Sequence, residues 1–150
     1  MDGMVMEQNT LQKEVTILIV DDDSIDRMAF IRSLRKAKVA NPYVEAHDGA
    51  EALDILRGNN GHARLTGPCI ILLDWNMPRL GGEAFLEALR ADPDLGMHVV
   101  FVLTTSDSDE DRLAAYRKHV AGYIVKSRAA EGFLDAVTML DRYWRVVELP

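Results

Sequence analysis

Aspartates directly follow two of the most apolar segments of this chain. Residues 15–20 lead into Asp21, Asp22 and Asp23, and the uncharged run 69–73 stops at a single carboxylate, Asp74. A segment that is apolar at nearly every position predicts a strand buried on both faces. Parallel strands of one sheet bring their carboxyl ends to the same edge, where ligands usually bind. The sequence therefore predicts a cluster of carboxylates at one edge of a sheet.

Two further strands would deliver a hydroxyl and a cation to this edge. The apolar run 98–103 ends at Thr104, and residues 121–125 end at Lys126. Several carboxylates in one pocket repel each other, which a divalent cation relieves, and hard oxygen ligands suit Mg²⁺. A carboxylate, a metal ion, a hydroxyl and an ammonium group together suit an incoming phosphoryl group.

The positions of these residues depend on five alternations of strand and helix. Proline, glycine and capping residues separate the segments: Ser24 is expected to cap the first helix, and Asp23 to be a helix-start residue rather than a ligand. This pattern predicts a doubly wound α/β domain with a five-stranded parallel sheet and helices on both faces. Strands are expected at residues 15–20, 43–46, 69–73, 98–103 and 121–125, and helices at about 24–38, 50–57, 83–91, 109–119 and 129–145.

Length and composition narrow the class of protein. The 150 residues suit one domain, divided here into a polar leader (1–14), the α/β domain (15–145) and an apolar tail (146–150). A net charge of −7 without any basic run argues against a nucleic-acid partner. No apolar run reaches membrane length and no signal peptide is evident, so we expect a cytoplasmic protein without membrane contact. The single cysteine, Cys69, fits a reducing compartment.

The motifs at the strand ends resemble those of response regulator receiver domains. The resemblance covers residues 15 to about 145 and is carried by Val20-Asp21-Asp22, Asp74 with Met77-Pro78 and Gly81-Gly82, Thr104, and Gly122-Tyr123 before Lys126. It implies a flavodoxin-like strand order, 2-1-3-4-5. It also implies that the protein is not an enzyme beyond its own phosphorylation and dephosphorylation.

Family resemblance also assigns roles to the site residues. Asp74 would accept a phosphoryl group from a sensor histidine kinase. Mg²⁺ would be held by Asp22, Asp74 and the main-chain carbonyl of Asn76, with Asp21 acting through water. Thr104 would close on the phosphoryl group and Lys126 would pair with it, while Tyr123 would swing inward in the active form; Asn76 and Ser106 would tune the lifetime of the phosphoryl group.

One position departs from the family pattern. Receiver domains usually have proline after the lysine, whereas this chain has Ser127. A cis Lys126–Ser127 bond would cost about 2.5–4 kcal/mol, so the bond is either trans with a different loop shape or cis and strained. Lys126-Ser127, the Leu103–Ser106 segment, the long loop 58–68 and the aromatic tail 144–150 resemble the branch associated with bacterial phytochromes. The kinase would then be a bacteriophytochrome.

Two other classes of function remain open from the sequence. The Asp21-x-Asp23 spacing fits a phosphatase of the haloacid dehalogenase type with Asp21 as nucleophile, although the late acidic pair and the cap insertion of that class are missing. A receiver-like scaffold that is never phosphorylated is the second, although such a protein would be expected to lose Asp74 or Lys126. Tyr123 could also be a packing residue of an edge strand, without any switching role.

Finally, the C-terminal segment suggests self-association. After the last helix only residues 146–150 remain, too few for an output module, so the output is expected to be contact with another protein. One stripe of the last helix would dock on the sheet: Phe133, Val137, Leu140, Trp144 and Val147. A second apolar stripe lies beside it: Ala136, Met139, Tyr143 and Val146. We expect Tyr143, Trp144, Val146 and Val147 to form a two-fold homodimer interface, with packing of both stripes on the chain's own core as the alternative.

Overall fold

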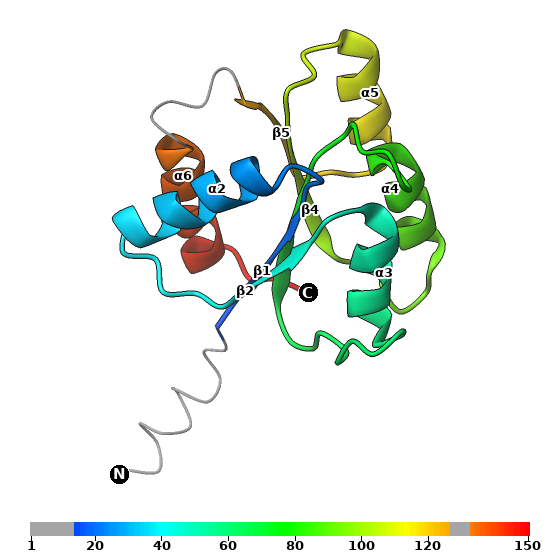
Figure 1. Cartoon of the computed structure of the whole chain (residues 1–150), viewed down its shortest axis with the longest axis horizontal. Helices are drawn as coiled ribbons and strands as arrows, with labels where there is room; N and C mark the ends of the chain where they lie inside the picture. Colours follow the sequence, from blue (N-terminus) through cyan, green and yellow to red (C-terminus); the bar gives the residue numbers. More distant parts are fainter. Residues whose placement is uncertain (1–13, 127–132) are drawn as a thin grey trace.

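The computed structural model describes residues 14–126 and 133–150. Five strands alternate with five helices along the chain, and Figure 1 shows the sheet between two layers of helices. The strands are β1 (Thr16–Val20), β2 (Tyr43–Ala46), β3 (Cys69–Leu73), β4 (Val99–Thr104) and β5 (Gly122–Val125). The helices are α2 (Ser24–Lys36), α3 (Gly49–Arg57), α4 (Gly82–Ala91), α5 (Asp109–Arg117) and α6 (Leu134–Val146).

The five strands are parallel and pair in the order β2-β1-β3-β4-β5, which confirms the predicted fold class and strand order. Val20 lies opposite Leu73, so the chain leaves β1 and β3 at neighbouring points, where Asp21 and Asp74 follow. Thr104 lies opposite Val125, directly before Lys126. The register therefore brings residues distant in sequence to one edge of the sheet.

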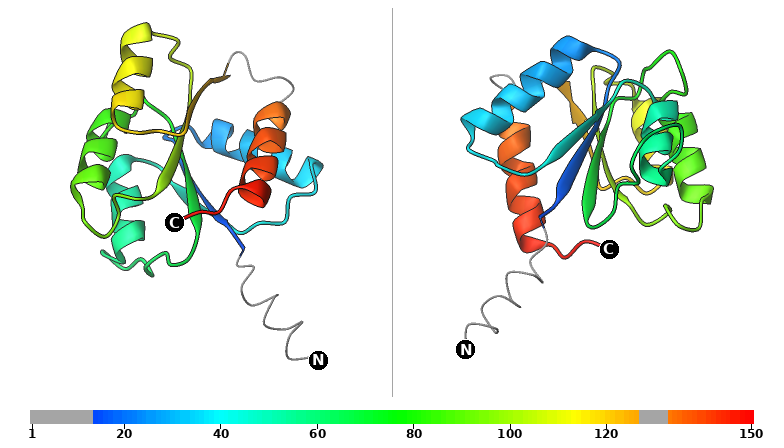
Figure 2. Two further views of the ribbon diagram at one scale, coloured as in Figure 1. Left: turned by 180° about the vertical axis from the view of Figure 1, so that it is seen from behind. Right: turned by 60° about the horizontal axis from the view of Figure 1, so that its bottom comes forward.

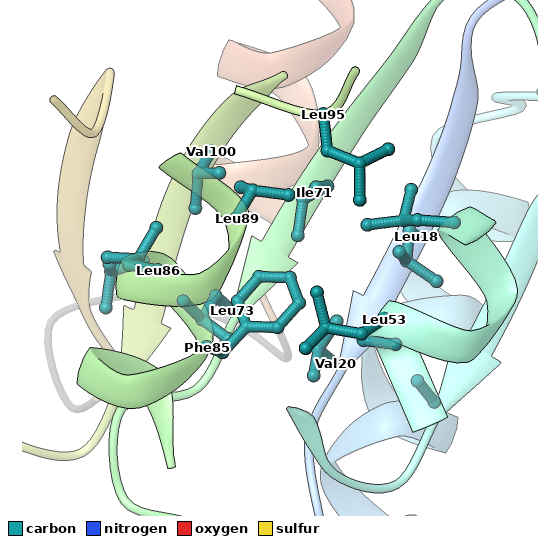
Figure 3. Packing of buried hydrophobic residues seen from close by; sticks show 14 of the residues in the cluster. Leu18, Val20, Leu53, Ile71, Leu73, Phe85, Leu86, Leu89, Leu95 and Val100 are labelled. Carbon is teal, nitrogen blue, oxygen red and sulfur yellow. The ribbon is translucent and has the colours of Figure 1, made fainter. Parts of the chain in front are cut away.

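Each face of the sheet has its own hydrophobic core. Strand residues alternate between the faces, which explains why the central strands are apolar at every position. One core lies under α3, α4 and α5 and includes Leu18, Val20, Ile71, Leu73, Phe85 and Leu89 (Figure 3). The other lies under α2 and α6, which pack together on the opposite face (Figure 2), and includes Ile17, Ile19, Ile70, Leu72, Phe30 and Leu140.

Several helix ends differ from the sequence prediction. The N-cap of α2 is Asp23, whose carboxylate accepts hydrogen bonds from the backbone N–H groups of Ile25 and Asp26, and Ser24 is already helical. Asp23 is therefore a helix-start residue, as predicted, and the assignment of Ser24 as the cap was wrong. Helix α5 ends at Arg117 rather than at residue 119. Helix α6 spans Leu134–Val146 after Phe133, which has a left-handed backbone (φ 72°), and the predicted helix start at residue 129 lies outside the described residues.

The C-terminal part of α6 packs more closely on this chain than expected. Tyr143 stacks edge-on against Phe101 of β4, with ring centroids 5.0 Å apart, and Trp144 packs against the core under α2 and α6. Trp144 therefore packs on the chain's own core with the rest of its stripe, and Tyr143 of the neighbouring stripe also contacts the sheet. Val146 does project, with 82% of its surface exposed, and Val147 is 40% exposed.

Arg90, in the last turn of α4, organises the amino edge of the sheet, opposite the carboxylate cluster. Its guanidinium donates hydrogen bonds to the backbone carbonyls of Gly96, His98, Lys118 and His119, at 2.7–2.9 Å. One side chain thus joins the α4–β4 connection to the end of α5.

No helix among residues 14–126 and 133–150 is long and apolar enough to cross a membrane.

Candidate functional site

Three aspartates meet at the carboxyl edge of the sheet. Oxygen atoms of Asp21, Asp22 and Asp74 all lie within 4.8 Å of one another. Asp21 and Asp74 are 6% and 8% exposed, whereas Asp22 faces solvent. Elsewhere in the part of the chain that the structure describes, no second group of three His, Cys, Asp or Glu residues comes as close together.

Burial and charge repulsion make ionised Asp74 costly. Burial raises the pKa of Asp74 from 3.8 to about 6, and the carboxylates of Asp21 and Asp22 add to this rise. The hydroxyl of Thr104 and the charge of Lys126 act in the opposite direction without cancelling it. Burial also raises the pKa of Asp21, against hydrogen bonds from Lys126 and from the backbone N–H of Asp23. The site is therefore short of positive charge.

These three carboxylates fit a divalent cation. They supply hard oxygen donors on neighbouring strand ends, and the exposed Asp22 leaves one side open to water, as Mg²⁺ requires. A cation there would also offset the desolvation that raises the pKa of Asp74. Asn76, whose carbonyl the sequence suggested as a further ligand, is exposed in the loop after β3.

Lys126 makes two ion pairs at this edge. Its Nζ donates to Asp21 Oδ2 at 2.6 Å and to Asp26 Oδ2 at 2.7 Å, and 7% of its side chain is exposed. Burial alone would lower the pKa of Lys126, but the hydrogen bonds to Asp21 and Asp26 raise it. The Lys126–Ser127 bond, expected to be either cis or trans, lies outside the described residues.

The sequence analysis did not assign Asp26 to the site. Asp26 lies in the first turn of α2, three residues after the N-cap. Helical spacing keeps residue 26 on the same side of the helix as Asp23, but the rotation of α2 against the sheet decides whether that side meets Lys126. A weak signal was available, because an acidic residue one turn beyond Asp21-Asp22-Asp23 stays near the same edge.

Thr104 and Tyr123 lie next to this cluster, on β4 and β5. Thr104 is fully buried, and its hydroxyl lies close enough to lower the pKa of Asp74. The hydroxyl of half-buried Tyr123 donates to the backbone carbonyl of Ser106 at 2.9 Å. Ser106 Oγ in turn donates to Asp111 on α5 at 2.6 Å. The β4–α5 loop thus connects Thr104, the phenol of Tyr123 and α5.

The loop that carries Asn76 rests on the start of α3. The backbone N–H of Gly49 donates to the carbonyl of Leu80 at 3.2 Å, and Arg79 Nε lies 3.7 Å from Asp48 Oδ2. A methyl group added at Gly49 would overlap the Leu80 carbonyl oxygen, so this close approach requires glycine. The sequence analysis did not predict this contact.

Comparison with known proteins identifies the family. The family model of the response regulator receiver domain matches residues 17–138 of this chain. The chain therefore belongs to the response regulator receiver family, which displaces the haloacid dehalogenase alternative.

Several relatives are phytochrome response regulators. Response regulator Rcp1 of Synechocystis sp. is 31% identical over 135 residues, which cover 89% of this chain and 92% of Rcp1. The crystal structure of Mn²⁺-bound Rcp1 has a TM-score of 0.80 and covers 92% of this chain and 99% of that one. The phosphorylated cyanobacterial phytochrome response regulator RcpA has a TM-score of 0.82 at 31% identity, with the same coverage. The bacteriophytochrome response regulator RtBRR is 33% identical with a TM-score of 0.72, covering 90% and 83%.

Proposed function

We propose that this protein is a cytoplasmic response regulator that accepts a phosphoryl group on Asp74 and passes the signal to a partner protein. The observation that carries the proposal is the convergence at one sheet edge of Asp21, Asp22 and Asp74 with the Thr104 hydroxyl and the Lys126 ammonium. No output by DNA binding is included, since the chain carries a net charge of −7.

The reaction is a transfer between two nucleophiles. A carboxylate oxygen of Asp74 attacks the phosphorus of a phosphohistidine, the O–P bond forms, and the P–N bond breaks. The leaving imidazole nitrogen keeps the electron pair and takes up a proton. Lys126 and the Thr104 hydroxyl then provide positive charge and a hydrogen bond to the phosphoryl oxygens.

We assign the Mg²⁺ ligands to Asp22, Asp74 and the main-chain carbonyl of Asn76, with Asp21 acting through water. The bound ion would neutralise charge on the transferring phosphoryl group. The close spacing of the three carboxylates supports this assignment, as does the fact that Rcp1, a relative, was crystallised with Mn²⁺.

Signal transmission would use Thr104 and Tyr123. When Thr104 moves toward the phosphoryl oxygens, it vacates space beside β5 that the Tyr123 ring can enter. Tyr123 would then give up its hydrogen bond to the Ser106 carbonyl, which frees the β4–α5 loop and changes the surface formed by α5, β5 and α6. Thr104→Ala should still be phosphorylated but leave amide NMR shifts of Gly122–Val125 unchanged; equal wild-type shifts with and without phosphate would contradict the switch.

The phosphodonor would be a sensor histidine kinase, and the similarity to RcpA and RtBRR points to a phytochrome kinase. Transfer from a purified bacteriophytochrome kinase, compared with a kinase of another class, would test this assignment by the rate of phosphate transfer.

We further propose a two-fold homodimer at the end of α6. Val146 and Val147 supply its exposed apolar surface, and Tyr143 and Trp144 supply only the parts of their side chains that the core leaves uncovered. Val146→Asp should dissociate the dimer without disturbing the core, as measured by the molar mass in solution; a monomeric wild type would refute the interface.

The central experiment maps the phosphorylated residue. Incubation with acetyl phosphate and Mg²⁺ should add one hydroxylamine-labile phosphate to Asp74, detected by mass spectrometry. Asp74→Asn should take up none, because an amide is not a nucleophile, and Asp135→Asn, an exposed control on α6, should behave like the wild type. Undiminished single-site phosphorylation of Asp74→Asn would refute the site, and an unreactive wild type would favour the scaffold alternative.

A further inference from the structure

Lys126 is held by two carboxylates, of which one does not belong to the metal cluster. Asp21 is part of the group of three aspartates, but Asp26 is not, because its oxygens do not join that group. Nevertheless Asp26 Oδ2 lies 2.7 Å from Lys126 Nζ, nearly the same distance as Asp21 Oδ2 at 2.6 Å. The ammonium is therefore shared between the site and the first turn of α2.

Asp26 differs from Asp21 in how freely it can give up this contact. The Asp26 side chain is 30% exposed, whereas that of Asp21 is 8% exposed and also accepts the N–H of Asp23 at 2.9 Å. If Lys126 leaves Asp26, water can replace the ammonium at the Asp26 carboxylate at low cost. If Lys126 leaves Asp21, a buried carboxylate loses its cation.

The demand for positive charge at this edge changes when a phosphoryl group arrives. Before that, one ammonium faces Asp21 and Asp26 and interacts with the charge of Asp74. A phosphoryl group on Asp74 adds oxygens that need the same ammonium. The three N–H donors of Lys126 can serve Asp21 and a phosphoryl oxygen, and the solvated carboxylate of Asp26 is the partner most easily released.

We propose that Asp26 is a positioning residue that competes with the phosphoryl group for Lys126 and thereby sets the affinity of the site for that group. The proposal rests on phosphorylation of Asp74. In the resting protein Asp26 holds the ammonium toward α2, and a phosphoryl group draws it away at the expense of this ion pair. Because Asp26 lies in the first turn of α2, the exchange also links the charge on Asp74 to the face on which α2 and α6 pack.

Beryllofluoride, which attaches to aspartate as a phosphoryl mimic, tests the competition without a kinase. In the presence of saturating Mg²⁺, Asp26→Asn should bind beryllofluoride about fivefold more tightly than the wild type, equivalent to about 1 kcal/mol for a partly exposed ion pair. Asp26→Glu keeps the charge and should stay within about twofold of the wild type. Fluorine NMR of the bound mimic should also show one resonance shifted between the wild type and Asp26→Asn, because the ammonium moves closer to one fluorine.

Two controls separate competition from other effects. Asp107→Asn removes an exposed negative charge from the β4–α5 loop, at the same edge, and should change the affinity by less than about twofold. Asp26→Ser removes the carboxylate with a different side chain and should tighten binding as Asp26→Asn does, so an unstable asparagine variant does not end the test. Unchanged or weaker beryllofluoride binding by these two variants would overturn the proposal. A wild type that binds no beryllofluoride would instead overturn phosphorylation of Asp74.

Discussion

Two partly buried cations at opposite edges of the sheet show how partner chemistry separates a structural role from a responsive one. Arg90 donates to four backbone carbonyls, which are neutral and fixed in place by the chain. Lys126 instead pairs with the carboxylates of Asp21 and Asp26, which are side chains with a charge of their own. An incoming anion can replace one of the carboxylates that contact Lys126. At Arg90 there is no carboxylate to replace, because its partners are backbone carbonyls that the chain holds in place.

The pKa shifts of the two cations express the same difference. Burial lowers the pKa of Arg90, and its neutral partners do not restore it. Burial also acts to lower the pKa of Lys126, but the hydrogen bonds to Asp21 and Asp26 raise it overall. The carbonyls hold Arg90 through hydrogen bonds of fixed geometry. The carboxylates hold Lys126 through charge attraction, which changes when another anion enters the site.

The largest expected effect is the loss of phosphoryl-mimic binding in Lys126→Met. Removal of the ammonium leaves the carboxylates and the arriving anion without their nearest cation, so beryllofluoride affinity should fall about 100-fold, or about 3 kcal/mol. Arg90→Met, titrated in parallel under conditions in which it is folded, should bind beryllofluoride with the affinity of the wild type. Equal losses in the two variants would show that both cations act through the stability of the fold.

Arg90→Met should instead lower the free energy of unfolding by about 3 kcal/mol, because four carbonyls lose charge-assisted hydrogen bonds. Urea unfolding measures this change. Arg117→Met, at an exposed position of α5, is the matched control and should change stability by less than about 0.5 kcal/mol. A similarly small change in the free energy of unfolding for Arg90→Met would refute the structural role assigned to Arg90.

Without divalent cations, the carboxylate cluster should make stability depend on pH. The pKa of Asp74 is about 6 in the folded protein and 3.8 as the reference value, so the folded state binds the proton more tightly. This group's contribution to stability is therefore greatest below pH 3.8, declines as the pH rises through 6, and is then constant. At pH 7.5, Asp74→Asn should be more stable than the wild type by about 2–3 kcal/mol, and this gap should close near pH 4.

Addition of Mg²⁺ at pH 7.5 should also narrow that gap in stability. Bound Mg²⁺ stabilises the wild type more than the asparagine variant, which lacks the Asp74 carboxylate. Thermal unfolding of both proteins at several pH values, with and without Mg²⁺, measures all of these differences. A gap that is constant from pH 4 to 7.5 would contradict the charge repulsion assigned to this edge.

A smaller effect is expected where the backbone itself positions the site. Gly49→Ala should cost about 2 kcal/mol, because the new methyl group displaces the Leu80 carbonyl. The displacement should also weaken Mg²⁺ binding, since the same loop carries Asn76. Gly81→Ala, whose new methyl group would lie 3.4 Å from its nearest neighbours, should cost less than about 1 kcal/mol. If the two alanine variants lose equal stability, the contact at Gly49 is not special.

Most of the carboxyl-edge cluster could be predicted because strands are simple to interpret. Uninterrupted apolar runs mark buried parallel strands, and a parallel sheet sends the residues after each strand to one edge. Asp21, Asp74, Thr104 and Lys126 therefore come together for reasons visible in the sequence, and the register Val20 to Leu73 confirms the juxtaposition.

Helix orientation was what the sequence left undetermined. Asp26 reaches Lys126, and Tyr143 and Trp144 turn toward the core, only because α2 and α6 dock on the sheet at particular rotations. Periodicity defines the faces of a helix, but the face that meets a given neighbour depends on packing across the whole layer. The order of elements, the fold class and the strand-end residues were thus determined by the sequence alone. The partners of Lys126, the four carbonyls around Arg90 and the contact at Gly49 were decided by the tertiary structure, because each joins segments whose distance and angle no local pattern records.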